Sequence, residues 1–159
     1  MKRTNDIQAQ YQLAKKEEGI LMAAAKILER RLHREGAIAD PGEAAQFLIA
    51  RCSALPHEVF GVMFLDARHR ILATENLFTG TVDGCEVHPR VVAQEALRYN
   101  AAAVILFHNH PSGEPEPSAA DRALTARLKQ ALALLDIRVL DHMVVGGCRH
   151  VSMAARGWV

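Results

Sequence analysis

The chain has 159 residues, of which half are hydrophobic and 23% are charged. This is the composition of an ordinary globular domain, large enough to bury a core without disulfides or metal ions. The formal net charge of +1 argues against a protein that binds nucleic acid or anionic lipid through its overall charge. There is no run of about 18 apolar residues and no secretory signal, so we predict that the protein does not enter a membrane.

Three cysteines, Cys52, Cys85 and Cys148, lie far apart and form no CxxC pair. An odd number of scattered cysteines favours free thiols in a reducing compartment over a disulfide framework. We therefore expect a cytoplasmic protein.

Two helices are predicted in the first third of the chain. Residues 6–35 carry apolar side chains at helical spacing, and Gly19 is a point at which this helix is expected to break or loosen. A second helix is expected to begin at Pro41, with Asp40 as its N-cap, and to run to about Cys52.

A β-hairpin and a third helix are predicted next. Residues 58–66 and 71–78 are rich in aromatic and aliphatic side chains on either side of a turn, which predicts two antiparallel strands. A third short strand is predicted at residues 82–87. A helix then begins at Pro89 and runs to about Tyr99. Its apolar side is expected to carry Val92, Ala96 and Leu97.

The last third of the chain alternates strands with a helix. Residues 102–107 are an unbroken apolar run, typical of a central strand that is buried on both faces. A loop rich in proline and glycine, residues 111–117, leads into a helix over residues 118–135. Strands are predicted at residues 137–145 and 149–153. This order predicts a mixed α/β layered fold rather than a regular βαβ series.

The most informative stretch is HNHP at residues 108–111, followed by a carboxylate at Asp121. Alternate residues of an extended chain point to the same side, so His108 and His110 can bind one ion, and Pro111 disfavours a helical conformation at His110. Two imidazoles and a carboxylate suit Zn²⁺ better than Mg²⁺ or Ca²⁺. Three protein ligands leave the open position that distinguishes a catalytic zinc site.

The same residues also have simpler interpretations. Ser118 and Asp121 form the S-x-x-D pattern of a helix cap, and the two histidines could be polar residues at a strand end. The full combination at fixed offsets favours a metal site, and Ser118 can act both as a cap and in catalysis.

A zinc hydrolase also needs a base that accepts the proton of its water. From the residues alone, Glu58 is no better a candidate for this base than Glu75, Glu86 or Glu95.

Several short motifs resemble the RadC branch of the JAMM (MPN+) family. They are HNHPSG (108–113), PS..D (117–121), FLD (64–66), LFTGT (77–81), VHPR (87–90) and LDHMVVG (140–146). The resemblance covers about residues 41–159, which follow an N-terminal helical extension of residues 1–40. It implies an α/β (α+β) fold of the MPN/JAB type, a mixed β-sheet flanked by helices with cytidine-deaminase-like layering.

The resemblance implies a JAMM-type zinc metallopeptidase or isopeptidase with one Zn²⁺ per chain. His108, His110 and Asp121 correspond to the metal ligands. Glu58 opens a segment similar to the family pattern E-x-x-G and corresponds to the general base, and Ser118 corresponds to the hydrogen-bond donor to the oxyanion. The implied substrate is a protein or peptide, and a homodimer is left open.

Two alternative functions remain. A RadC-type DNA-repair or nucleic-acid-associated accessory protein is disfavoured by the low net charge. In addition, longer RadC relatives carry an N-terminal helix-hairpin-helix segment whose glycine pattern is not visible in residues 1–40. A non-catalytic MPN scaffold typically lacks the ligands that this sequence has.

Three residues close to the motif have no fixed role. Asp141 and His142 either orient metal ligands or form a locally satisfied pair at a strand end. Asn109 is expected to point away from the ligands and to stabilise the loop.

Overall fold

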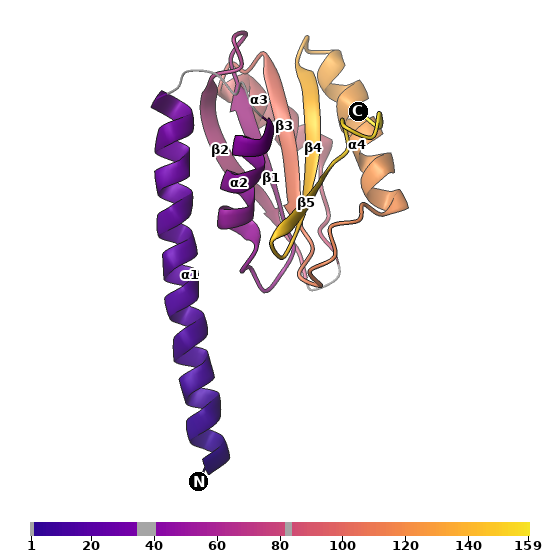
Figure 1. Cartoon of the computed structure of the whole chain (residues 1–159). Coiled ribbons are helices and arrows are strands. Elements are labelled where there is room, and N and C mark those ends of the chain that lie inside the picture. The colour runs from indigo at the N-terminus through magenta and orange to yellow at the C-terminus, as the bar shows by residue number, and fades with distance from the viewer. Residues whose placement is uncertain (1, 35–40, 82–83) are drawn as a thin grey trace.

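A computed structural model describes residues 2–34, 41–81 and 84–159 as a layered α+β fold (Figure 1). Its elements are, in chain order, α1 (Lys2–Arg34), α2 (Pro41–Cys52), β1 (Val59–Leu65), β2 (Ile71–Thr79), α3 (Pro89–Arg98), β3 (Ala103–Asn109), α4 (Ala119–Ala133), β4 (Arg138–Gly146) and β5 (Arg149–Ser152). The predicted fold class, a mixed sheet with flanking helices, is confirmed.

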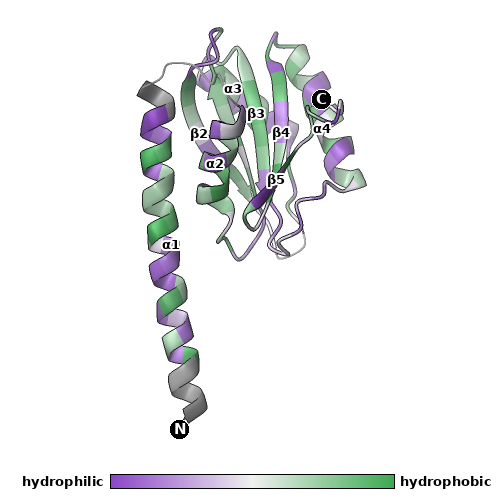
Figure 2. Ribbon diagram, in the orientation of Figure 1, coloured by the Kyte–Doolittle hydropathy of each residue, from purple (hydrophilic) through white to green (hydrophobic). Residues whose placement is uncertain are grey.

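The five strands form one sheet in the order β2-β1-β3-β4-β5. Only β3 and β4 pair in parallel, and the other neighbours are antiparallel. β3 lies at the centre, and all seven of its residues are buried, as its unbroken apolar sequence predicts. Figure 2 shows the green of hydrophobic residues along these central strands.

The sheet separates two hydrophobic clusters. On one face, α2 packs its Phe47 over Met63 and Phe107, and the C-terminal half of α1 packs against α2. On the other face, α3 and α4 cover a cluster that includes Leu106 and Leu128. Side chains alternate along each strand, so every position of β3 belongs to one of these two faces.

Only part of the first helix packs against the rest of the protein. α1 is one continuous helix through Gly19, so the predicted break is wrong. A glycine inside a helix costs only about 1 kcal/mol, and the helix-forming residues on both sides of it outweigh that cost. Beyond the domain, Ile7, Tyr11 and Ile20 are exposed, as the protruding N-terminal half of α1 in Figure 1 illustrates. The predicted N-cap of α2, Asp40, lies outside the described residues.

Two further predictions are wrong. Residues 84–87 form no strand, and residues 82–83 lie outside the described part of the chain. Backbone pairing beside β1 continues to Thr81, whose carbonyl accepts the Glu58 N–H, and the Thr81 N–H donates to the Gly84 carbonyl. Residues 84–87 are not part of the sheet. Leu97 is exposed rather than buried, because it follows the buried Ala96 and is rotated about 100° around the helix axis.

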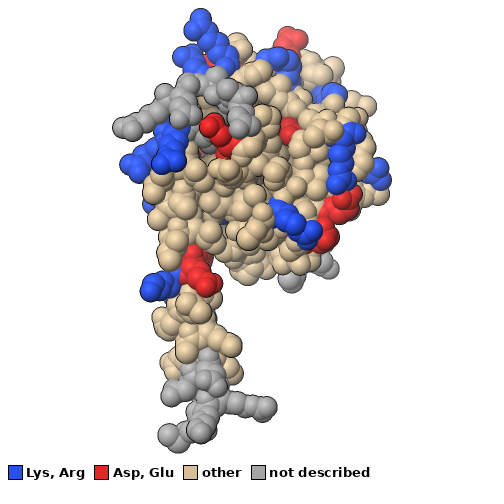
Figure 3. Space-filling view, in the orientation of Figure 1, with Lys and Arg blue, Asp and Glu red and all other residues tan. Residues whose placement is uncertain are grey.

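The surface carries both signs of charge. Figure 3 shows Lys and Arg side chains interspersed with Asp and Glu on the face that it displays. Within the described residues, no helix combines the length and the apolar character that crossing a membrane requires.

Candidate metal site

The first two predicted ligands lie where the central strand ends. His108 belongs to β3 and is 1% exposed, and the His110 N–H continues the pairing with β4 by donating to the Val145 carbonyl at 2.8 Å. The chain then turns at Pro111, and Gly113 takes a left-handed conformation with φ of 84°. The main chain at both histidines is therefore held by the sheet, as the sequence predicts.

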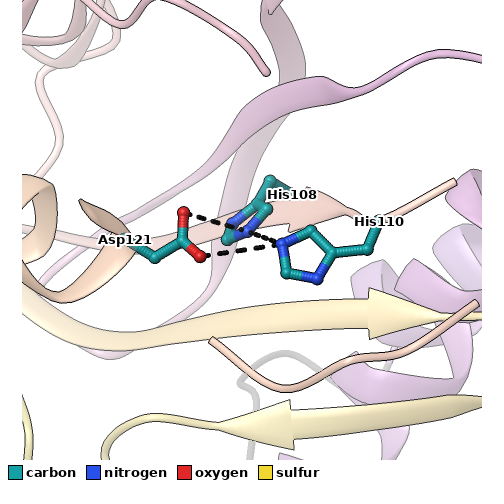
Figure 4. A group of neighbouring side chains, drawn as sticks. All are labelled: His108, His110 and Asp121. Carbon is teal, nitrogen blue, oxygen red and sulfur yellow. Dashed lines mark hydrogen bonds and ion pairs between the residues drawn. The ribbon is translucent and has the colours of Figure 1, made fainter. Parts of the chain in front are cut away.

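The three predicted ligands converge on one point. One ligand atom from each of His108, His110 and Asp121 lies within 4.8 Å of the others, and Figure 4 shows the side chains pointing toward one another. The two Nε2 atoms are 3.0 Å apart, and the Asp121 oxygens lie 3.5 Å from His108 Nε2 and 3.6 Å from His110 Nε2. Ligands about 2.0–2.2 Å from a tetrahedral zinc ion lie roughly 3.3–3.6 Å apart, so the donor set fits zinc with little adjustment.

Asp121 is fixed by the start of α4. Ser118 is the N-cap of this helix, and its backbone N–H and its hydroxyl each donate to Asp121 Oδ2 at 2.7 Å. The Asp121 N–H in turn donates to Ser118 Oγ at 3.1 Å, which completes a capping box. Because Oδ2 already accepts two hydrogen bonds, Oδ1 is the better ligand atom. The predicted cap at Ser118 is therefore present, and its hydroxyl hydrogen is bound to the carboxylate.

His110 is oriented by the loop that follows it. Its Nδ1 lies 2.8 Å from the Glu114 carbonyl, which can only accept, so Nδ1 carries the hydrogen and Nε2 offers a lone pair to the site. This loop lies directly on β4, because a Cβ at Gly146 would come within 2.5 Å of Pro115 N. A side chain at Gly146 would therefore displace the carbonyl that orients His110.

The charges of the ligands are coupled in the protein without metal. A hydrogen bond with Asp121 raises the pKa of His110, and the Glu114 carbonyl and the charge of Glu58 act in the same direction, while burial opposes them. Burial would raise the pKa of Asp121, but the neighbouring imidazoles of His108 and His110 outweigh this effect and hold the pKa of the carboxyl group far below its usual range. A proton therefore competes with a metal ion for His110 more strongly than it would at an ordinary imidazole.

We predict that zinc affinity falls as the pH is lowered, beginning above the ordinary imidazole range of about 6.5. The raised pKa makes the His110–Asp121 ion pair stabilise the metal-free protein at acidic pH, and this stabilisation is lost as the pH rises through the pKa of His110. Below that pKa, displacing one proton weakens zinc binding by about tenfold per pH unit. Competition with a chelator of known proton affinity measures this slope, and a dissociation constant independent of pH would contradict the prediction.

A cavity of about 570 Å³ opens over the ligands. Glu58, Ser118, His110 and Asp121 all line it, so the structure brings the predicted base and the predicted oxyanion donor beside the ligands. The other lining residues include small or apolar side chains from the segment before α3 and from α4, such as Val87 and Leu124.

The three glutamates that were alternative candidates for the base lie away from the ligands. Glu75 accepts a hydrogen bond from the Tyr99 hydroxyl, and Glu95 pairs with Arg98. The Glu86 side chain is 86% exposed. None of the three lines the cavity over the ligands.

Buried Asn109 holds the segment that carries Glu58. Its Oδ1 accepts the Val59 N–H at 2.8 Å, and its Nδ2 donates to the His57 carbonyl at 3.1 Å. Asn109 thus binds the backbone on both sides of Glu58, whose own N–H donates to the Thr81 carbonyl at 2.9 Å. Asn109 does point away from the ligands, but the segment that it stabilises is the start of β1 rather than its own loop.

Asp141 and His142 lie on opposite faces of β4. Asp141 accepts hydrogen bonds from Ser152 Oγ at 2.6 Å and from the Ala154 N–H at 2.9 Å, so it fastens the C-terminal segment to the sheet. His142 is fully buried on the ligand side, with Nε2 only 2.8 Å from His108 Nδ1. His142 therefore contacts the site, and Asp141 has a structural role.

The three cysteines are free, as predicted. Burial raises the pKa of Cys52 to about 12 and also raises the pKa of Cys85, which lines the cavity. Neither environment favours a thiolate nucleophile.

Two histidines lie at the end of the central strand of the layered sheet, and an aspartate lies at the start of the next helix. This arrangement defines a JAB-type domain with a candidate metal site. The chain belongs to the family of the RadC-like JAB domain, whose model matches residues 38–158.

Relatives of the chain share the name UPF0758 protein. The chain is 54% identical over 143 residues to a "UPF0758 protein" of Xanthomonas campestris pv. campestris (strain 8004), covering 87% of this chain and 64% of that protein. It is also 54% identical over 142 residues to "UPF0758 protein" of Stutzerimonas stutzeri (strain A1501), covering 89% of this chain and 63% of that protein. The chain thus spans slightly less than two thirds of the length of these relatives.

Proposed function

We propose that this chain is a zinc-dependent hydrolase of peptide or isopeptide bonds that uses a JAMM-type site. The observation that carries the proposal is the convergence of three ligand side chains beneath a cavity that Glu58 and Ser118 also line. A metal site, a base and a hydrogen-bond donor in one cavity are the parts that hydrolysis of an amide requires.

Metal binding and proton transfer would be performed by different residues of the site. His108, His110 and Asp121 would hold the ion. Zinc, when bound, lowers the pKa of water towards neutrality and polarises a substrate carbonyl. Glu58 would accept the proton of the attacking water and then deliver it to the leaving amine.

Ser118 would donate a hydrogen bond to the tetrahedral oxyanion, a contribution of about 3 kcal/mol to the barrier. Its hydroxyl hydrogen is bound to Asp121 Oδ2, so the hydroxyl must rotate toward the cavity for this role. The backbone N–H of Ser118 would continue to hold the carboxylate during that rotation.

The charges of the cavity favour an amide over a phosphodiester as substrate. Among its lining residues the ionisable side chains include Glu58 and Asp121, and the described lining contains no Lys or Arg. Two carboxylates repel a phosphate backbone, and nucleic-acid enzymes depend on basic side chains for affinity.

The test is a comparison of zinc-loaded and chelator-treated protein on peptide, isopeptide and DNA substrates. We expect about one zinc per chain, hydrolysis of an amide substrate, loss of activity with the metal and recovery on adding zinc. Cleavage of DNA would support the nucleic-acid alternative, and zinc binding without any amide hydrolysis would support the scaffold.

A further inference from the structure

We propose that Thr125 and His142 are positioning residues that force His108 to present the lone pair of its Nε2 to the metal site. This inference rests on the proposed function, because it concerns the orientation of a metal ligand. It starts from three buried side chains on three elements: His108 on β3, His142 on β4 and Thr125 on α4. We call their hydrogen bonds the tautomer network.

The position of each hydrogen follows from Thr125. Its Oγ1 lies 2.6 Å from the Asp121 carbonyl oxygen, and the only hydrogen available between these two atoms is that of the hydroxyl. Thr125 therefore donates to Asp121. The sulfur of Met153, at 3.7 Å from the same hydroxyl, is only a weak acceptor and does not compete.

The imidazole of His142 must then supply the next hydrogen. Its Nδ1 lies 2.6 Å from Thr125 Oγ1, whose single hydrogen is already used, so Nδ1 carries a hydrogen and donates it to the hydroxyl oxygen. His142 is 0% exposed, and a positive charge on a fully buried imidazole is costly, so the ring is neutral and its Nε2 has a lone pair.

The same reasoning fixes His108. Its Nδ1 lies 2.8 Å from His142 Nε2, which can only accept, so His108 Nδ1 carries the hydrogen. His108 Nε2 then carries a lone pair. This nitrogen faces Asp121 and lies 3.0 Å from His110 Nε2. The second nitrogen of a metal-bound histidine is commonly hydrogen-bonded in this way, and such partners tune metal affinity by about 10–100-fold.

Burial makes the tautomer network sensitive to loss of one member. Thr125 and His142 are 0% exposed and His108 is 1% exposed, so water cannot replace a missing hydrogen bond. The ring of Phe60 closes the network off, stacked on His108 at a centroid distance of 6.3 Å and edge-on to His142 at 5.5 Å. The network also joins two ligands, since Thr125 holds the main chain of Asp121.

The matched test is Thr125→Val against Thr125→Ser. Valine keeps the shape of threonine but leaves His142 Nδ1 without an acceptor. The favoured tautomer of His142 then has its hydrogen on Nε2, which donates to His108 Nδ1. The hydrogen of His108 moves to its Nε2. Serine keeps the hydroxyl. We expect the zinc dissociation constant, measured by chelator competition, to rise by about 10–100-fold in Thr125→Val and to stay close to wild type in Thr125→Ser.

A measurement on metal-free protein tests the network without zinc. Nitrogen-15 NMR, at a pH where the imidazoles are neutral, should place the hydrogen of His108 on Nδ1 in wild type and Thr125→Ser, and on Nε2 in Thr125→Val. Thermal unfolding of the metal-free variants shows whether each is folded, and the wild-type spectrum is decisive even if Thr125→Val does not fold.

The outcomes separate this inference from the proposed function. A hydrogen on His108 Nε2 in wild type, or equal zinc affinity in the two variants, would overturn the network. A wild-type protein that has the expected tautomer but binds no zinc would support the network and overturn the proposed function.

Discussion

Replacing Glu58 with glutamine is expected to lower kcat for amide hydrolysis by about 10²–10⁴-fold, the usual contribution of a general base. Glutamine has nearly the same size as glutamate but cannot take up the proton of water. Zinc should remain bound, because the three ligands His108, His110 and Asp121 are unchanged. Metal content and kcat measured on the same preparation test both halves of this expectation.

The backbone around Glu58 makes the variant easy to interpret. Asn109 and the Thr81 carbonyl fix this segment through main-chain groups, which the substitution does not alter. A loss of activity in E58Q can therefore be assigned to the carboxylate rather than to movement of the strand.

Glu86→Gln is the matched control for Glu58→Gln. It removes the same charge from an exposed side chain outside the cavity, so it should leave kcat unchanged. An E58Q protein as active as the E86Q protein would show that Glu58 is not the base, whereas equal losses in both would indicate a general effect of charge.

The ligand set could be predicted from the sequence because its geometry is local. His108 and His110 share a face through the two-residue period of a strand, and the position of Asp121 follows from a capping pattern. The buried strand before them is equally clear, since an unbroken apolar run needs protein on both faces.

The tautomer network could not be predicted in the same way, because it depends on register between distant strands. His142 lies 34 residues after His108, and it reaches the ring only because β3 and β4 pair in parallel with Leu106 opposite His142. Thr125 has one local signal in the sequence: it lies four residues after Asp121, so both side chains project from the same face of α4.

A close approach of two strands explains the glycine at position 61. A Cβ at Gly61, in the E-x-x-G pattern, would lie 2.1 Å from the ring of Phe107, so this glycine admits an aromatic side chain of the central strand. A suitable local pattern was not sufficient at residues 84–87, which belong to the strand predicted at 82–87 but form no ladder with the sheet. A strand also requires backbone pairing, which a local pattern does not specify.

Replacing Asp121 with alanine is expected to remove zinc from the protein. A bound zinc ion contributes about 10–16 kcal/mol in sites with four ligands, so one ligand carries roughly 3 kcal/mol and its loss should raise the dissociation constant by about 100-fold or more. His108→Ala should have the same effect, because it removes a nitrogen that faces Asp121. Zinc content after gel filtration measures both variants.

Ser118→Ala is the control that separates ligation from helix capping. Asp121→Ala and Ser118→Ala each break the capping box, at a cost of about 1 kcal/mol to the start of α4, but only the first removes a ligand. Without metal, Ser118→Ala should therefore unfold at a temperature as low as that of Asp121→Ala, but it should keep its zinc. Its kcat should fall by about 10²–10³-fold if the hydroxyl donates to the oxyanion. Retention of zinc in both His108→Ala and Asp121→Ala would refute the site. Loss of zinc in Ser118→Ala would instead mean that the cap, through its two hydrogen bonds to Oδ2, is what makes Asp121 a ligand.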